Sequence, residues 1–350
     1  MKKYLLPKCG SFYKANLHCH TTVSDGKLTP EQVKELYKSK GYSVVAYTDH
    51  DVLISHPELN DKDFIALNGY EMEVREGVVT DADRTDYMAN KTERKQCHMC
   101  FIAIEPDNLE MVCYNRENYC YFENVKYRDQ VHYADHKPDY FRHYTPECIS
   151  DMMVKGRENG YFVTYNHPAW SLEDFTQYTK YSGMHAMEIC NYSCFRDGYD
   201  DYSPRVYDDM LRAGKRIFCI GADDNHNKFS VDSRMSDSGG AFTMIKAEKL
   251  EYKKITDALV KGEFYASQGP EIYELYYQDG KIYVKTSRAD KIVLNTGRRR
   301  VQVAFDEDGT GVKSAVFNVF EGDNYVRITV TDHHGKHANT NAYFVDELLK

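Results

Sequence analysis

The stretch KANLHCHTTVSDGKLTPEQVKELYKSKGYSVVAYTDHD, residues 14–51, decides the fold of the first part of the chain. It opens with a strand-like run, residues 14–20, which a polar loop follows. Thr29 is a typical helix N-cap and Pro30 suits the first helical position, so a helix is predicted to begin there. Residues 43–47 then read as a buried strand. Strand, loop, helix and strand form the repeating unit of a parallel α/β fold.

The same rhythm continues along the chain, with strand-like runs at 64–67, 161–165, 186–191 and 217–221. Histidines and carboxylates recur near the C-terminal ends of the predicted strands, as at His50, Glu71, His167 and Asp224. Enzymes built as α/β barrels place their chemistry at the C-terminal ends of the strands. We therefore expect these polar side chains to meet at one mouth of the fold.

The pattern changes after about residue 268. Short alternating runs separated by Gly, Asp and Asn predict a small antiparallel β-sandwich without helical spacers. We predict an α/β domain over residues 1–267 and a β-sandwich accessory domain over residues 268–350.

The composition of the chain limits the classes of partner that it is expected to bind. The chain has 350 residues and a formal net charge of −9, so bulk electrostatics do not favour a long polyanion, and nucleic acid is not an expected partner. No apolar run reaches the roughly 18 residues that span a bilayer, and the N-terminus lacks the pattern of a signal peptide. The ten cysteines show no framework spacing, so we expect reduced thiols in the cytoplasm. The oligomeric state stays open.

His18 and His20 alternate on a strand, so both imidazoles project from one face and can reach one ion. Two half-exposed strand histidines would explain this pair alone equally well. Asp25 follows in a Ser24-Asp25-Gly26 turn, where the glycine lets the loop fold back toward the same cavity.

Two further sites follow predicted strands. His50 lies between Asp49 and Asp51, an arrangement in which a carboxylate can hold the second ring nitrogen of a metal-bound imidazole; an exposed polar loop is the alternative. Glu71 suits a carboxylate that bridges two divalent ions, although a lone glutamate is more often a surface residue. We expect His50 and Glu71 to take part in catalysis with Asp49, which can orient a ligand or carry a proton.

The later part of the pattern supplies His167, in Asn166-His167-Pro168, and the pair Asp224 and His226, which repeats the alternation of His18 and His20. Histidine and carboxylate together suit zinc, manganese or iron rather than magnesium or calcium. Ligand type does not separate those three metals.

These motifs, in this order, resemble the PHP (polymerase and histidinol phosphatase) family of metal-dependent phosphoesterases. The resemblance implies a distorted (β/α)7 barrel and up to three divalent ions. It assigns the first ion to His18, His20, Glu71 and Asp224, the second to Glu71, His98 and His167, and the third to Asp25, His50 and His226. Asp223 is a rival of Asp224 because the family's last motif is often one residue shorter.

The resemblance implies a hydrolase in which a hydroxide held between metal ions attacks a small-molecule phosphate ester. Residues 258–270 resemble a branch of the family that carries an appended β domain and is similar to carbaryl hydrolase. A carbamate, ester or amide hydrolase with the same centre is therefore an alternative. From another class, a non-catalytic protein that binds metal or a glycan also stays open.

Overall fold

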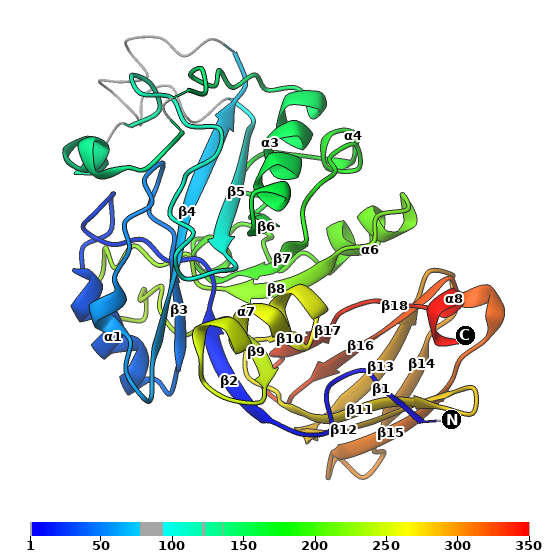
Figure 1. Cartoon of the computed structure of the whole chain (residues 1–350). Helices are drawn as coiled ribbons and strands as arrows, with labels where there is room; N and C mark the ends of the chain where they lie inside the picture. Colours follow the sequence, from blue (N-terminus) through cyan, green and yellow to red (C-terminus); the bar gives the residue numbers. More distant parts are fainter. Residues whose placement is uncertain (1, 78–93, 121–122, 135, 350) are drawn as a thin grey trace.

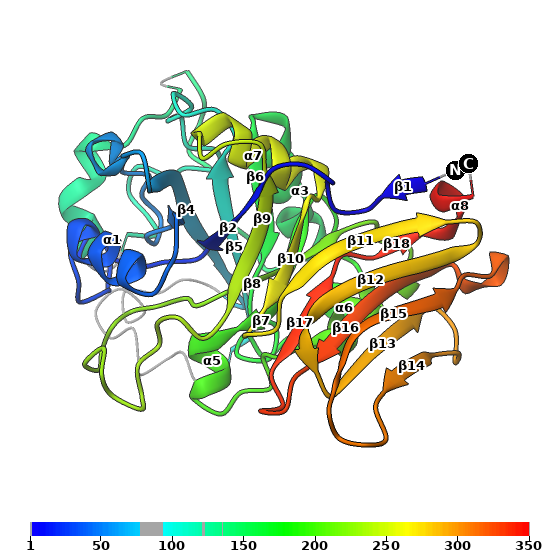
Figure 2. The ribbon, with the colours of Figure 1, turned by 90° about the horizontal axis from the view of Figure 1, so that it is seen from below.

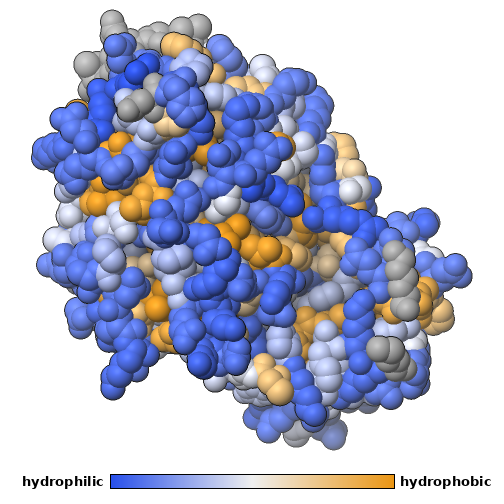
Figure 3. All heavy atoms as spheres, in the orientation of Figure 1, coloured by the Kyte–Doolittle hydropathy of each residue, from blue (hydrophilic) through white to orange (hydrophobic). Residues whose placement is uncertain are grey.

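The computed structural model describes residues 2–77, 94–120, 123–134 and 136–349. A long curved sheet, with helices on its outer side, continues into a lobe made mainly of β-strands, and both chain termini lie at that lobe (Figure 1, Figure 2). The surface in this view is largely hydrophilic and is interrupted by separate apolar patches (Figure 3). Within the described residues, no helix combines the length and the apolar character needed to cross a bilayer.

The first helix begins where its capping signals predict. The Thr29 side chain accepts a hydrogen bond from the Gln32 backbone at 3.3 Å, and the Gln32 side chain accepts one from the Thr29 backbone at 2.9 Å. At the start of α3 (Pro146–Glu158), the Thr145 side chain accepts a hydrogen bond from the Cys148 backbone at 3.2 Å. The described helices are α1 (Pro30–Ser39), α3 (Pro146–Glu158), α4 (Phe175–Tyr178), α5 (Tyr192–Arg196), α6 (Pro204–Arg212), α7 (Tyr252–Lys261) and α8 (Val345–Leu348).

The first part of the chain forms a mixed sheet, as the predicted α/β class requires. Neighbours pair in parallel along β2–β3–β4 and along β6–β7–β8, whereas β5 is antiparallel to both β4 and β6. The strands are β2 (Ser11–Asn16), β3 (Val44–Tyr47), β4 (Ile65–Arg75), β5 (Gln96–Ala103), β6 (Tyr161–Tyr165), β7 (Ala186–Asn191), β8 (Phe218–Ala222), β9 (Phe242–Ala247) and β10 (Phe264–Ser267).

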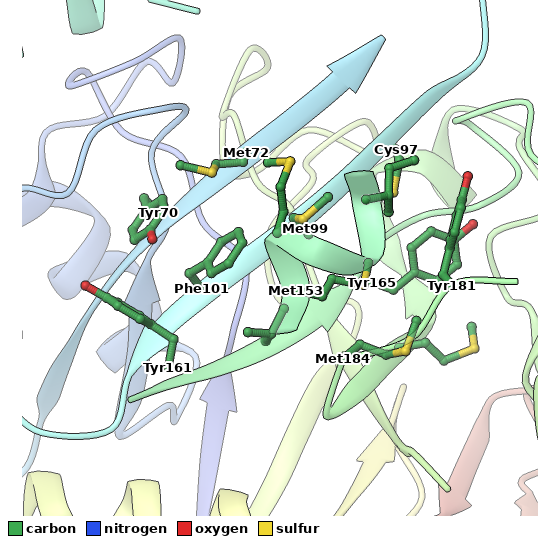
Figure 4. Close-up of a cluster of buried hydrophobic side chains, with 14 of the residues drawn as sticks. Tyr70, Met72, Cys97, Met99, Phe101, Met153, Tyr161, Tyr165, Tyr181 and Met184 are labelled. Carbon is green, nitrogen blue, oxygen red and sulfur yellow. The ribbon is translucent and has the colours of Figure 1, made fainter. Parts of the chain in front are cut away.

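Strand β4 runs past the point where the sequence suggested its end. Only its first residues pair with β3, and the rest form a long antiparallel hairpin with β5. Its alternate residues divide between two environments. Tyr70 and Met72 pack with Met99, Phe101 and Met153 in the core (Figure 4), while Glu71 projects to the opposite side. The rings of Tyr70 and Phe101 stack with centroids 4.9 Å apart, so the core holds the strand that carries Glu71.

The predicted (β/α)7 barrel is not found as a closed barrel. Within the described residues, no strand ladder joins β8 to β2. The chain just beyond each strand does meet, however: Cys19 forms an isolated parallel bridge with Asn225, and the Asp224 backbone donates to the His18 carbonyl at 3.0 Å. The segments that follow β2 and β8 therefore meet, although the two strands themselves share no ladder.

The β-rich part is not a self-contained sandwich. One of its two sheets has the order β1–β11–β12–β15, whereas β17 pairs with β10 and so continues the large sheet. A single apolar core, which includes Ile282 and Ile328, lies between the two sheets. The boundary after residue 267 stays a prediction. The strands are β1 (Lys2–Tyr4), β11 (Ile272–Gln278), β12 (Lys281–Ala289), β13 (Lys291–Thr296), β14 (Gln302–Phe305), β15 (Val312–Asn318), β16 (Tyr325–Thr331), β17 (His337–Thr340) and β18 (Tyr343–Phe344).

Candidate metal centre

The two alternating pairs predicted from the sequence lie side by side. The segments after β2 and β8 run in parallel, and the His20 backbone donates to the Asn225 carbonyl at 3.1 Å. Because the segment after β2 is extended, His18 and His20 point to the same side. Asp224, which has a left-handed backbone conformation, faces them from the neighbouring segment. Nε2 of His20 lies 3.1 Å from Nε2 of His18 and 3.0 Å from the Asp224 carboxylate.

The other candidate ligands approach from β3, β4, β5 and β6. His50 follows β3 and forms an isolated parallel bridge with Glu71. His98 lies near the start of β5, but β5 is antiparallel, so its start lies at the same end of the sheet as the ends of its neighbours. His167 follows β6. The Asn166 backbone donates to the His98 carbonyl at 3.1 Å and so joins these two segments.

Glu71 lies at the middle of the cluster, and its two oxygens face different imidazoles. Oε1 is 3.2 Å from His18, 3.1 Å from His98 and 3.5 Å from His167. Oε2 is 3.4 Å from His20 and 3.1 Å from His50. This division between the two oxygens is compatible with a carboxylate that bridges two cations.

Asp25 completes the cluster at its edge. Its Oδ1 lies 3.4 Å from Nε2 of His226 and 3.8 Å from Nε2 of His50. Gly26 makes this approach possible, because a Cβ there would stand 2.6 Å from the His20 carbonyl oxygen. The glycine therefore acts through a close backbone contact that excludes any side chain.

All nine predicted ligands lie in one cluster, but they group differently from the three assignments that the resemblance implies. His20 lies with the Asp25 group as well as with Asp224, and His98 lies with His50. The donor groups within 4.8 Å are His20, Asp25, His50 and His226; His18, Glu71 and His167; His18, His20 and Asp224; and His50, Glu71 and His98.

Several buried polar atoms of the cluster support a cation site. Nδ1 of His20, Oδ1 of Asp25 and Oδ1 of Asp224 are buried and make no hydrogen bond of good geometry within the described residues, although imidazole nitrogens lie 3.4 Å from Asp25 and 3.0 Å from Asp224. Burying a polar atom without a partner is costly, so such atoms are uncommon in folded proteins. Three of them on the donor side of one cluster fit a site for divalent cations.

The charges of the cluster are strongly coupled. Burial would raise the pKa of Glu71, but the imidazoles of His18 and His98 lower it well below its usual value. Burial opposes the charged form of His98 and His226, yet nearby carboxylates raise the pKa of each to about 9. Burial and the neighbouring His20 lower the pKa of His50 to about 3. The carboxylates thus stay ionised and present negative charge to the cluster.

Two of the candidate ligands have an uncommon backbone conformation. His167 has a φ of 25° and Asp224 a φ of 53°, in the left-handed region that non-glycine residues seldom adopt. Such strain persists only where the surroundings enforce it, and it concentrates at functional sites. The conformation turns each side chain inward directly after its strand.

The cluster is more exposed on one side than on the other. The side chains of Asp25 and His226 are 17% and 15% exposed, whereas those of His18 and Glu71 are 0% and 1% exposed. The more exposed side of the cluster is therefore the one formed by Asp25 and His226.

Asp49, a predicted catalytic residue, does not face the cluster. Its carboxylate accepts hydrogen bonds from the backbone and hydroxyl groups of both Thr21 and Ser24, at 2.6 to 3.1 Å. With both oxygens engaged, Asp49 holds the loop that carries Asp25. Asp51 also points elsewhere, toward Arg142 at 2.6 Å.

The choice between Asp223 and Asp224 depends on where each carboxylate points. Asp223 accepts hydrogen bonds from Tyr37 and from the backbone of Gly239, Gly240 and Ala241, away from the imidazoles. Asp224 faces His18 and His20. Its place in the cluster fits the alternation from which it was chosen.

Three other residues of the site lie outside the motifs that the sequence analysis used. Glu188 on β7 contacts His18, and a carboxylate inside an otherwise apolar strand was the signal that could have revealed it. The ring of Trp170 packs against those of His98 and His167 with centroids 5.1 and 5.0 Å away. Asp201 accepts hydrogen bonds from the backbone of Ala169 and Trp170 and so holds this turn.

No family model and no curated protein matches the chain. Among solved structures, it is similar to a two-domain protein from Bacteroides vulgatus that contains a predicted PHP-like metal-dependent phosphoesterase, with 14% identity, 98% of each chain covered and a TM-score of 0.43. The chain resembles the PHP family. This resemblance rests on the motifs and on their convergence in one cluster.

Two further structures are similar over a smaller share of the chain. One is described as a candidate metal-dependent phosphoesterase from Bifidobacterium adolescentis, with 15% identity, 64% of this chain and 90% of that chain covered, and a TM-score of 0.36. The other is an amidohydrolase from Chromobacterium violaceum, with 15% identity, 61% and 87% covered, and a TM-score of 0.34.

Proposed function

We propose that the chain is a metal-dependent hydrolase whose substrate is a small-molecule phosphate ester. The observation that carries the proposal is the convergence of six imidazoles and three carboxylates from separate segments on one cluster. Histidine and carboxylate donors together suit zinc, manganese or iron.

The proposed ligands are the nine residues of the cluster, with Glu71 between the donor groups. Bound divalent ions would supply Lewis acidity and neutralise negative charge on phosphate oxygens. The protein itself contributes position. Strand ends hold His18, His50 and His167 at one mouth, so a substrate meets donors that are already in place.

The buried and exposed sides of the cluster have different roles in this proposal. Donors around Glu71 are shielded from solvent, which strengthens their electrostatic interactions. The edge formed by Asp25 and His226 remains partly open, and we place the approach of the substrate there.

Metal analysis followed by a substrate screen tests this function. Protein purified without chelators should contain zinc, manganese or iron and should release phosphate from a panel of aryl and alkyl phosphomonoesters. The same preparation is assayed on aryl esters, carbamates and amides. Turnover of those carbonyl substrates alone would contradict the phosphoester assignment while leaving the hydrolase, and absence of metal and of all turnover would contradict both.

A further inference from the structure

Glu188 is a buried carboxylate that contacts three parts of the cluster. It lies on β7, and its side chain is 0% exposed. Oε1 accepts a hydrogen bond from Nδ1 of His18 at 2.7 Å. Oε2 accepts from the His167 backbone at 3.0 Å and from the Asn191 side chain at 2.9 Å.

Each contact leads to one candidate ligand. A carboxylate that accepts from Nδ1 of His18 fixes the tautomer in which the proton is on Nδ1 and the lone pair of Nε2 can bind a metal ion. Nε2 is the nitrogen that faces Glu71. The bond to the His167 backbone holds that residue in its strained conformation. The Asn191 side chain, held by Glu188, also donates to the Asp224 carboxylate at 3.1 Å.

The same contacts argue against Glu188 as a ligand. Both of its oxygens already accept hydrogen bonds, and it belongs to none of the donor groups found among the described residues. A buried charge is costly unless it is paired and hydrogen-bonded, so this carboxylate needs the three donors that surround it. Its engaged oxygens leave it a role that acts through its neighbours.

We propose that Glu188 is a positioning residue, which orients His18, His167 and, through Asn191, Asp224 for cation binding. The cations concerned are the inner ones, held by the buried donors around Glu71. This inference rests on the proposed metal centre. It predicts that metal affinity depends on Glu188 although Glu188 does not touch the metal.

Zinc binding by metal-free protein tests the inference. Zinc affinity and stoichiometry are measured by competition with a chromophoric chelator for the wild type and for Glu188→Gln. A glutamine has one acceptor oxygen for three donors, and its amide N–H groups would face other N–H groups. We expect inner zinc binding to weaken about 10- to 100-fold, the range for residues that orient metal ligands, while one zinc remains at the edge formed by Asp25, His50 and His226.

The control is Asp323→Asn, which neutralises another carboxylate of a residue that is 2% exposed, in the β-rich part of the chain. It should leave zinc affinity unchanged. The visible spectrum of the cobalt-loaded proteins supplies a second readout, because a changed inner geometry alters the spectrum and a merely structural role does not.

If Glu188→Gln does not fold, Glu188→Asp keeps the buried charge but shortens the side chain, and the same loss of inner affinity is expected. Wild-type zinc affinity in whichever variant folds would overturn the role of Glu188. A wild-type protein that binds no zinc, manganese or iron would instead overturn the metal centre, and with it this inference.

Discussion

The inner and outer sides of the cluster are built by different means. On the inner side, Glu71 and His98 are part of paired strands whose opposite faces pack into the core. On the outer side, Asp25 and His226 lie in loops. Asp49 secures the first loop, and the Asp237 carboxylate accepts from the His226 backbone at 2.9 Å in the second.

This difference predicts that the two sides hold their cations with different affinity and release them at different rates. Donors fixed by a sheet and a core keep their geometry at little further cost when a cation leaves. Donors in loops depend on a few side-chain hydrogen bonds and are partly exposed. We therefore expect the inner cations to be held tightly and the outer cation to exchange first.

Glu71→Ala should have the largest effect. It removes both oxygens from the middle of the cluster, so the inner donor groups lose their shared carboxylate. We expect loss of inner metal and a fall in phosphoester turnover of more than about 100-fold, beyond the effect of losing an orienting residue. Turnover and metal content are measured beside Glu35→Ala, a change at an exposed position on α1. Full metal content in Glu71→Ala would contradict the bridging role.

Asp25→Asn should separate the two sides. The amide cannot supply the negative charge that faces His226, so the outer cation should be lost while the inner cations remain. We expect about one metal ion fewer per chain and a drop in turnover of roughly 10-fold or more. Metal counting after gel filtration checks this. Simultaneous loss of all metal would show that the two sides are not independent.

Asp49→Asn tests whether the hydrogen bonds of Asp49 hold the loop that carries Asp25. An amide accepts at one oxygen only, so some donors of Thr21 and Ser24 would lose their partner. We expect a loss of about 1–3 kcal/mol in the free energy of unfolding, from urea titration, and weaker outer metal binding with unchanged inner binding. Retained outer affinity would restrict Asp49 to stability alone.

The smallest effect is expected at His185, which lies outside the cluster. Its ring stacks on Phe162 and accepts a hydrogen bond from the Val163 backbone, and burial lowers its pKa to about 4 from 6.5. As pH falls from 6.5 toward 4, His185 becomes protonated in the unfolded chain but stays neutral in the folded chain. The wild type therefore loses stability in this pH range.

His185→Asn keeps an acceptor and removes this titration. The stability advantage of the wild type over this variant should therefore be largest near pH 7 and shrink by on the order of 1 kcal/mol by pH 4.5. Urea titrations at both pH values measure it, and other titrating groups cancel in the difference. A constant gap would show that His185 is not held neutral.

Much of the first unit follows from local sequence. The capping residues of α1 and α3 act within one turn, and the alternation of His18 with His20 is a property of any strand. The nine candidate ligands were predicted from short motifs and from the family resemblance that those motifs carry. Glu188 was missed because its importance lies in contacts with segments far away in the sequence.

Other differences between the prediction and the structure also arise from contacts between distant segments. The length of β4 depends on pairing with β5, and the continuity of the two sheets depends on pairing of β10 with β17. The role of Asp49 depends on which donors reach it. Local patterns report none of these, because each is a contact between distant segments.

By itself, the sequence determined where the first helix and several of the strands lie, which residue types follow those strands, and that those residues suit a divalent cation. Those properties depend on local backbone preferences and on the chemistry of single side chains. Only the tertiary structure decided that Asp224 rather than Asp223 faces the imidazoles, that Glu71 turns its two oxygens to different donors, and that Glu188 supports three ligands at once. Direction and distance between remote groups arise when the strands pair and the core packs, so they exist only in the folded chain.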